Sequence, residues 1–256
     1  MTRDTIYFFS DAHLGAPVPD APLWEKQCIA FLRTLPDRAA ALYILGDLFD
    51  FWIEYRFAIR PDYFKVIHEL KKLVDLGIPV HYFAGNHDFA FGTFITHTLG
   101  ITIHPGHEET VLQGRRVHLF HGDGLLGRDV GYKALRSILR NRVIQALYKL
   151  LPPAAGIPLA QFFSATSRHY SDRLISEKNI AEYREQAKVF LDKGNDIVFL
   201  AHSHRPELSR WGTKFYCNTG AWMRSGDFAT MTGGRVQLWR YREDGAAEEL
   251  PVVDRK

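Results

Sequence analysis

Five short apolar segments recur along the chain, and each ends abruptly in polar residues. They are TIYFF before Ser10-Asp11, ALYIL before Gly46-Asp47, PVHYFA before Gly85-Asn86, RVHLF before His121-Gly122 and DIVFLA before His202. Helix-like segments at 24–35 and 61–76 separate the first three, and the second carries an apolar stripe that begins at Phe64. Strands that alternate with helices of this length predict an α/β fold. Shorter strand-like segments after His204 predict a C-terminal part richer in β-structure.

The composition is that of an ordinary globular protein. A length of 256 residues predicts one domain over 1–256, and 46% hydrophobic with 24% charged residues excludes disorder of the whole chain. Cys28 and Cys217 each stand alone, which predicts reduced core thiols in a cytoplasmic protein. The N-terminus enters a strand at once and no run approaches about 18 apolar residues, so we expect neither a signal peptide nor a membrane span.

The segment 125–178 has a different character. It is helical in pattern, it is interrupted by LPPAAGIP, and it holds nine basic residues against three acidic ones. One interpretation is an amphipathic insertion that packs on its own core. The other is a lid whose apolar face meets the tail of a ligand while its basic residues meet phosphate. The two are compatible. A net charge of +3 and the lack of an aromatic stacking platform argue against a nucleic-acid partner.

The polar residues at the five strand ends form a set. Each pair alone is a weak signal, but strand ends of one sheet converge on one edge, so five in register predict a common site. Three oxygen donors and four imidazoles suit a pair of divalent metals such as manganese, iron or zinc. A bridging aspartate would hold the two ions about 3.5–4 Å apart. The candidate ligands are Asp11, His13, Asp47, Asn86, His121, His202 and His204.

In order and spacing, the motifs D-x-H, G-D, G-N-H-D, H and H-x-H resemble those of the calcineurin-like metallophosphoesterases. The resemblance implies a two-sheet β sandwich flanked by helices, with two divalent metal ions. It places Asp11, His13 and His204 on one metal and Asn86, His121 and His202 on the other. Asp47 would bridge the two.

Further stretches narrow the resemblance to one branch of this family. YILGDLFDFW, HGDGLLGRDVGYKALR, H-S-H-R-P and NTGAW look like the UDP-2,3-diacylglucosamine pyrophosphatases of lipid A biosynthesis. The resemblance implies metal-activated hydrolysis of that nucleotide lipid to UMP and 2,3-diacylglucosamine 1-phosphate, usually with Mn²⁺. It also implies a helical lid over 125–178 and peripheral contact with the inner membrane. Looser matches to substrate contacts fall on Asp129, Tyr132, Arg136, Ser167 and Arg168.

Two departures from that branch bear on the chemistry. Ala201 stands where a glycine usually precedes H-x-H, and His87 stands where many members have arginine. His87 fits a general acid or a stabiliser of transition-state charge, with Asp88 orienting it. Asp50 and Asp123 fit either acceptors that orient the ligands or caps of a helix or turn.

Two other functions stay open. A soluble phosphodiesterase for cyclic nucleotides or other small phosphoesters would keep the metals but has little use for an apolar lid. A scaffold that binds without turnover would be expected to have lost metal ligands, and all seven candidates are present.

Overall fold

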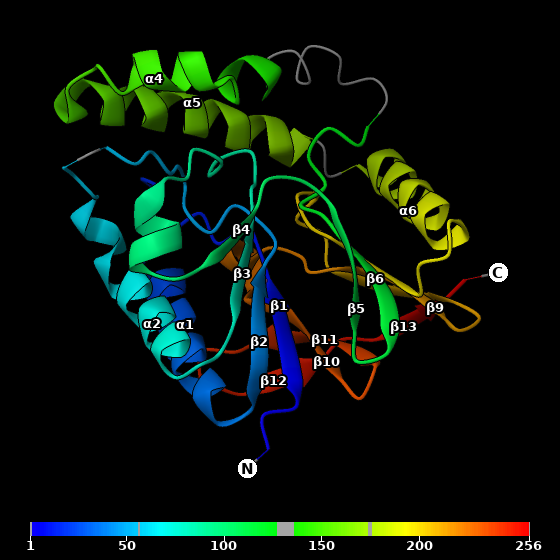
Figure 1. The fold of residues 1–256 in the computed structure, drawn as a ribbon. Helices are drawn as coiled ribbons and strands as arrows, with labels where there is room; N and C mark the ends of the chain where they lie inside the picture. Colours follow the sequence, from blue (N-terminus) through cyan, green and yellow to red (C-terminus); the bar gives the residue numbers. More distant parts are fainter. Residues whose placement is uncertain (1, 56, 127–135, 174–175, 256) are drawn as a thin grey trace.

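A computed structural model describes residues 2–55, 57–126, 136–173 and 176–255, with only the backbone given for 167–173. Two β-sheets face each other, and helices cover their outer faces (Figure 1). This two-sheet arrangement confirms the predicted fold class. The expectation that 1–256 forms one domain stays a prediction.

The first sheet combines the beginning and the end of the chain. The four strands from the first half of the chain pair in parallel, and the three strands from its last part pair antiparallel. The two parts join where Thr5–Phe9 pairs antiparallel with Asp227–Thr232. In spatial order its strands are β12 (Ala247–Glu249), β11 (Arg235–Tyr241), β10 (Asp227–Thr232), β1 (Thr5–Phe9), β2 (Ala39–Ile44), β3 (Val80–Phe83) and β4 (Thr102–His104).

The second sheet is built from the middle and late parts of the chain. In spatial order its strands are β13 (Val252–Asp254), β8 (Glu207–Trp211), β9 (Lys214–Asn218), β7 (Ile197–Leu200), β6 (Arg115–Leu119) and β5 (Glu108–Leu112). The strands β6 and β7 pair in parallel. The assumption of one common sheet was therefore wrong, because long-range pairing places β1, β2 and β3 in one sheet and β6 and β7 in the other.

Aromatic and aliphatic side chains fill the space between the sheets. The Phe8 ring from β1 stacks on the Phe199 ring from β7, with centroids 4.1 Å apart, and the Tyr43 ring from β2 also stacks on Phe8, with centroids 5.2 Å apart. All three side chains are buried. Because they come from both sheets, this stack fixes how β1 and β7 lie relative to each other.

Helices cover the outer faces. Helices α1 (Ala21–Thr34) and α2 (Phe64–Asp75) pack on the first sheet and α6 (Glu177–Asp192) on the second (Figure 1). Phe64, expected on the buried stripe of α2, is 66% exposed, and Val66 takes its place beside Ile67. Short helical turns occupy Leu35–Asp37, Pro61–Tyr63, Phe94–Thr98 and α7 (Trp222–Ser225).

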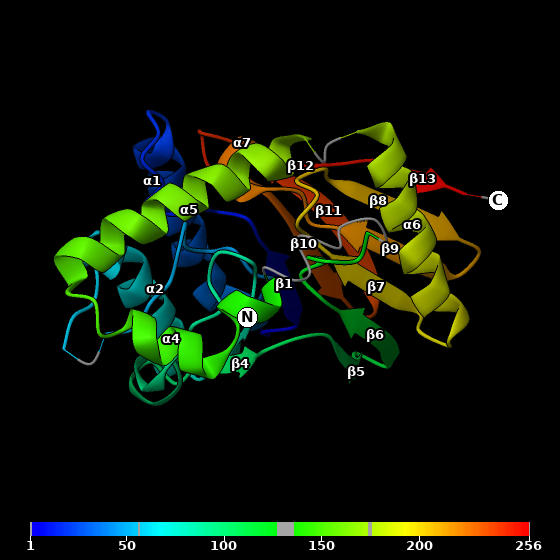
Figure 2. The ribbon, with the colours of Figure 1, turned by 90° about the horizontal axis from the view of Figure 1, so that it is seen from above.

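The remaining helices lie across one end of the sandwich (Figures 1 and 2). They are α4 (Arg142–Tyr148) and α5 (Pro153–Arg173), preceded by a helical turn at 136–139. The Tyr148 hydroxyl donates a hydrogen bond to the Gly156 carbonyl and so ties the two helices together. The expected break in the helical segment occurs at 149–152, between α4 and α5. It does not extend over all of LPPAAGIP, because α5 starts at Pro153, where a missing N–H costs nothing, and continues through Pro158. No helix in the described ranges has the length and apolar character needed to cross a bilayer.

Two residues after β9 hold in place the loop that follows β1 and carries the first candidate ligand, Asp11. The backbone N–H groups of Trp222 and Met223 donate to the carbonyls of Ser10 and Asp11, at 3.1 Å each. The loop that follows β1 is thus held by residues about two hundred positions later in the sequence.

Candidate metal centre

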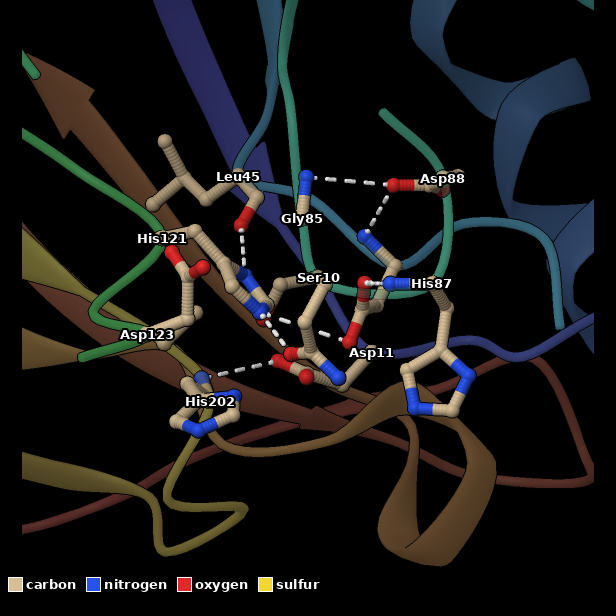
Figure 3. A network of polar contacts seen from close by, with 12 residues as sticks. Ser10, Asp11, Leu45, Gly85, His87, Asp88, His121, Asp123 and His202 are labelled. Carbon is tan, nitrogen blue, oxygen red and sulfur yellow. Dashed lines mark hydrogen bonds and ion pairs between the residues drawn. The ribbon is translucent and has the colours of Figure 1, made fainter. Parts of the chain in front are cut away.

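The loops that follow β1, β2, β3, β6 and β7 meet at one end of the sandwich, beneath α5 (Figures 1 and 3). The prediction that the five strand ends converge is confirmed, although they come from two sheets. Six of the seven candidate ligands are buried, and Asn86 is partly exposed.

Three overlapping groups of side chains bring their nitrogen and oxygen atoms within 4.8 Å of one another. Asp47 and His13 each belong to two of the groups. The groups are Asp11, His13 and His204; His13, Asp47 and His87; and Asp47, His121 and His202. Asn86 joins the last of them, because its Oδ1 atom lies 3.1 Å from His121 Nε2. The placement of Asp47 between the outer groups is what a bridging ligand requires.

The backbone at this site is strained. Six residues other than glycine have positive φ in the described part of the chain, and the sixth, Gln113, lies in a hairpin. The other five are candidate ligands: Asp11, His13, Asp47, His202 and His204, with φ between 43° and 65°. A left-handed backbone is costly for a residue with a Cβ and persists where the surroundings enforce it, typically at functional sites. These turns direct the side chains off the strand ends and toward one point.

Two glycines make room for the ligands. A Cβ at Gly85 would lie 2.0 Å from Asp47 Oδ1, and a Cβ at Gly46 would lie 2.5 Å from His121 Nδ1. Gly46 also has φ of +92°, which favours glycine. The glycines of the G-D and G-N-H-D motifs are therefore required by close approach of the ligand side chains.

His121 is held in a defined orientation. Its Nδ1–H donates to the Leu45 carbonyl at 2.7 Å (Figure 3), so Nε2 faces the site, 3.3 Å from Asp47 Oδ2. A backbone acceptor on the remote nitrogen is the usual partner of a metal-binding imidazole. Burial lowers the pKa of His121, but the Asp47 and Asp11 carboxylates outweigh it and raise that pKa to about 10. The metal-free site therefore holds a proton where a cation would bind.

The chemistry of the other donors fits a divalent metal. Both ring nitrogens of His13 are buried without a hydrogen-bond partner among the described residues, and so is the Nδ1 atom of His204. Burial, and then the neighbouring His87, hold the pKa of His13 well below its usual range, while burial and His121 lower that of His202 to about 4. These two imidazoles are neutral at physiological pH and can bind metal without losing a proton.

His87 and Asp88 lie side by side in the chain but make different contacts. The His87 Nδ1 atom is 2.9 Å from both the Asp50 carbonyl oxygen and Ser164 Oγ. Asp88 instead accepts hydrogen bonds from the backbone N–H groups of Asp47 and Gly85, at 2.9 and 3.2 Å (Figure 3). The contacts of Asp88 thus shape the loop of the bridging residue, and the ring of His87 is oriented by Asp50 and Ser164 in place of the expected Asp88.

Asp50 and Asp123, which were expected to orient the ligands or to cap a helix or turn, make different contacts from each other. Asp50 Oδ1 lies 3.8 Å from His13 Nδ1, beyond hydrogen-bonding distance. Asp123 is buried and forms ion pairs from Oδ2 with Arg136 Nε at 2.6 Å and an Arg140 terminal nitrogen at 3.2 Å. Arg140 also donates to the Gly85 carbonyl at 2.8 Å. These arginines fasten the start of the 125–178 segment to the loops of the site.

The expected substrate contacts are only partly described. Asp129 and Tyr132 lie outside the described residues, and the side chains of Ser167 and Arg168 on α5 are not described. Arg136 is placed beside Asp123, as given above. The role of all five in binding substrate stays a prediction.

Two contacts at the site were not predicted from the sequence. Ser164 reaches His87 from α5, and Asn218 at the end of β9 supports the H-x-H loop by donating to the Ala201 carbonyl and to Ser203 Oγ, at 3.1 and 3.0 Å. Asn218 belongs to the NTGAW stretch, which is one of the stretches that support the family resemblance. Ser164 lies in none of the motifs described in the sequence.

A buried set of aspartates and histidines on strand-end loops of a two-sheet sandwich defines a metal-dependent phosphoesterase. A family model described as calcineurin-like phosphoesterase matches residues 5–206. The chain belongs to the calcineurin-like phosphoesterases, which confirms the predicted membership. Enzymes of this family use divalent metals, and the candidate groups of this chain are suited to hold them.

Two relatives named as UDP-2,3-diacylglucosamine hydrolases are similar along most of the chain. UDP-2,3-diacylglucosamine hydrolase of Porphyromonas gingivalis is 33% identical over 181 residues, which cover 70% of this chain and 69% of that protein. The enzyme of the same name from Escherichia coli is 30% identical over 239 residues, covering 90% and 96%. Among solved structures, Vps29 from Entamoeba histolytica has a TM-score of 0.48 and 14% identity, covering 96% of this chain and 97% of that one.

Proposed function

We propose that this enzyme hydrolyses the pyrophosphate bond of UDP-2,3-diacylglucosamine to UMP and 2,3-diacylglucosamine 1-phosphate in lipid A biosynthesis. The observation that carries the proposal is the similarity to the Escherichia coli hydrolase over 90% of this chain and 96% of that protein. The apolar helices α4 and α5 beside the site agree with a substrate that has acyl tails.

The candidate ligands divide into two sets around Asp47. Asp11, His13 and His204 would hold one cation, and Asn86, His121 and His202 the other, with Asp47 shared. Bound divalent cations supply Lewis-acid chemistry, which lowers the pKa of water and neutralises charge on a phosphoryl group. We take Mn²⁺ as the native metal, with Fe²⁺ and Zn²⁺ as the alternatives that the same N/O donors accept.

The protein's own groups position the reaction. The Leu45 carbonyl fixes the His121 ring, and the backbone N–H of His87 donates to Asp47 Oδ1 at 2.9 Å. The His87 side chain, buried beside His13, would hold a proton at Nε2 for the leaving oxygen. Asp123 would keep Arg136 and Arg140 beside the site, where a guanidinium can meet phosphate.

A product assay tests the proposal. Metal-stripped protein with added Mn²⁺ is given UDP-2,3-diacylglucosamine, and bis-p-nitrophenyl phosphate is assayed in parallel as a generic diester. We expect UMP release that His121→Ala abolishes. Turnover of the diester alone would reject the nucleotide lipid and favour a phosphodiesterase for small phosphoesters. Turnover of neither substrate by metal-bound protein would favour a binding scaffold.

We further propose that the enzyme works in the cytoplasm and reaches its substrate at the inner membrane through α4 and α5. Val143, Leu147 and Leu150 are 65%, 57% and 79% exposed, and Phe162 on α5 is 67% exposed. Arg142 and Lys149 lie in the same stretch of sequence. Exposed apolar side chains beside basic ones favour an anionic lipid surface.

Replacing both Leu147 and Leu150 with glutamate should remove this binding. Because both side chains are exposed, the fold should tolerate the change, while two new charges oppose insertion among lipid headgroups. We expect loss of co-sedimentation with anionic vesicles at low salt and unchanged hydrolysis of bis-p-nitrophenyl phosphate. Val111→Glu is the matched control, because Val111 is 65% exposed on β5. Absence of vesicle binding by the wild-type protein would contradict the proposal.

A further inference from the structure

Helix α5 turns a row of small residues toward the loops of the metal centre. Gly156, Ala160 and Ser164 recur at every fourth position, which places them on one helix face, and all three are buried. A Cβ at Gly156 would lie 2.0 Å from the Tyr55 hydroxyl oxygen, so this face passes very close to the segment after Asp50. Ser164 is the member of the row with a polar side chain, and only 5% of it is exposed.

The Ser164 hydroxyl lies at a junction of three groups. Its Oγ atom donates to the Asp50 carbonyl at 2.7 Å and lies 2.9 Å from His87 Nδ1. The same Nδ1 atom is 2.9 Å from the Asp50 carbonyl oxygen. A carbonyl can only accept, and the hydroxyl uses its one proton on that carbonyl. Both neighbours of Nδ1 are therefore acceptors, which requires that Nδ1 carries a proton.

The opposite nitrogen of His87 faces the candidate ligands. The Nε2 atom is buried without a hydrogen-bond partner among the described residues, and the His87 and His13 rings lie perpendicular with centroids 4.6 Å apart. His87, His13 and Asp47 form one of the groups whose ligand atoms lie within 4.8 Å of one another. Since the proton on Nδ1 is fixed by acceptors, Nε2 is the nitrogen that can take up a second proton and donate it to a bound phosphate ester.

We infer that Ser164 is a positioning residue for the hydrolysis: with the Asp50 carbonyl, its hydroxyl keeps one proton on Nδ1 of His87, so that the second proton, which the ring would give to the leaving oxygen, is taken up at Nε2 and faces the reacting phosphate. The inference rests on the proposed function in that it assigns His87 to the leaving oxygen. It follows that the inserted helix contributes a group to the catalytic site itself, in addition to its surface for lipid. The loops of the sandwich alone leave the His87 ring with one acceptor at Nδ1, the Asp50 carbonyl.

Kinetics of Ser164→Ala test this role. Loss of one of the two acceptors lets the ring rotate or change tautomer, so we expect kcat to fall about 10- to 100-fold with KM little changed, as for other groups that orient a catalytic residue. Ser164→Thr keeps the hydroxyl and should recover most of the rate. Thr166→Ala is the matched control, because Thr166 lies on the exposed face of the same helix and donates to the Phe162 carbonyl.

Two further measurements separate positioning from packing. In a His87→Gln background, Ser164→Ala should have no additional effect on kcat, because both changes remove the same function. An equal loss in both backgrounds would overturn the inference. In ¹⁵N-histidine spectra, with His87→Gln used for assignment, the His87 signals should show the Nδ1–H tautomer in the wild type and lose it in Ser164→Ala. An unchanged tautomer in the variant would also overturn it.

Failure of the inference can be told apart from failure of the proposed function. Each variant is assayed on UDP-2,3-diacylglucosamine and on bis-p-nitrophenyl phosphate. If the wild type cleaves only the diester, the nucleotide-lipid function fails, and the diester kinetics still decide the role of Ser164. The spectra decide it without any substrate.

Discussion

Hydrolysis of bis-p-nitrophenyl phosphate by Asp47→Ala is expected to fall about 10⁴-fold or more below that of the wild type, on the scale of losing an essential catalytic group. Asp47 is common to two of the three groups that can hold metal, with Oδ2 3.3 Å from His121 Nε2. Alanine removes the carboxylate that we propose as the bridge between the two ions. Steady-state rates and the metal content of the purified variant, by mass spectrometry, measure the effect.

Asp75→Ala is the matched control, since Asp75 is an exposed acid in an ion pair with Lys71 on α2. Its rate should equal that of the wild type. In Asp47→Ala, the pKa of His121 should also fall, because the Asp47 carboxylate is the leading charge that raises it. A variant that stays folded, keeps two metal ions and retains a rate within about tenfold of the wild type would refute the bridging role.

Addition of Mn²⁺ to chelator-treated protein is expected to raise its stability and to release protons. A ligand present at about a thousand times its Kd stabilises the native state by about 4 kcal/mol, which thermal unfolding detects as a higher Tm. Metal binds neutral imidazole. In the metal-free protein, the pKa of His121 is raised to about 10, so this ring carries a proton at neutral pH that a metal must displace.

The sign of the pH dependence follows from these pKa values. Because His121 is protonated below about pH 10, the apparent metal affinity should rise as pH increases toward that value and fall on acidification. His202, with its pKa lowered to about 4 by burial and by His121, is already neutral and releases no proton. Calorimetric titration in buffers of different ionisation enthalpy measures the protons released.

His68→Ala serves as a control for the calorimetry, because His68 is exposed on α2. Its proton release should match that of the wild type. Metal binding without proton release, at an affinity that is flat across neutral pH, would exclude His121 from the metal site.

Much of the site could be predicted from the sequence because the ligands lie in five short motifs, one at the end of each of five strands. The motifs around Asp47 and Asn86 also contain the glycines that the close approach of side chains requires. The division of the strands between the two sheets could not be predicted from the sequence, because it depends on pairing between distant strands, such as β1 with β10. No local pattern contains that information.

The contacts from the inserted segment could not be predicted for a similar reason. Ser164 and His87 are 77 positions apart, and Arg140 and Gly85 are 55 apart. A serine in a helix among apolar residues has no local feature that distinguishes a buried contact from an exposed hydroxyl. Only the packing of α5 on the segment after Asp50 reveals it.

The placement of β1 has a consequence for biosynthesis of the protein. This strand leaves the ribosome well before β10, with which it pairs, and the loop after it accepts hydrogen bonds from Trp222 and Met223. A nascent chain that has not yet reached these residues cannot hold Asp11 in its final position. Metal acquisition is therefore expected to follow synthesis of Trp222 and Met223, which makes loading with the cation a late maturation step.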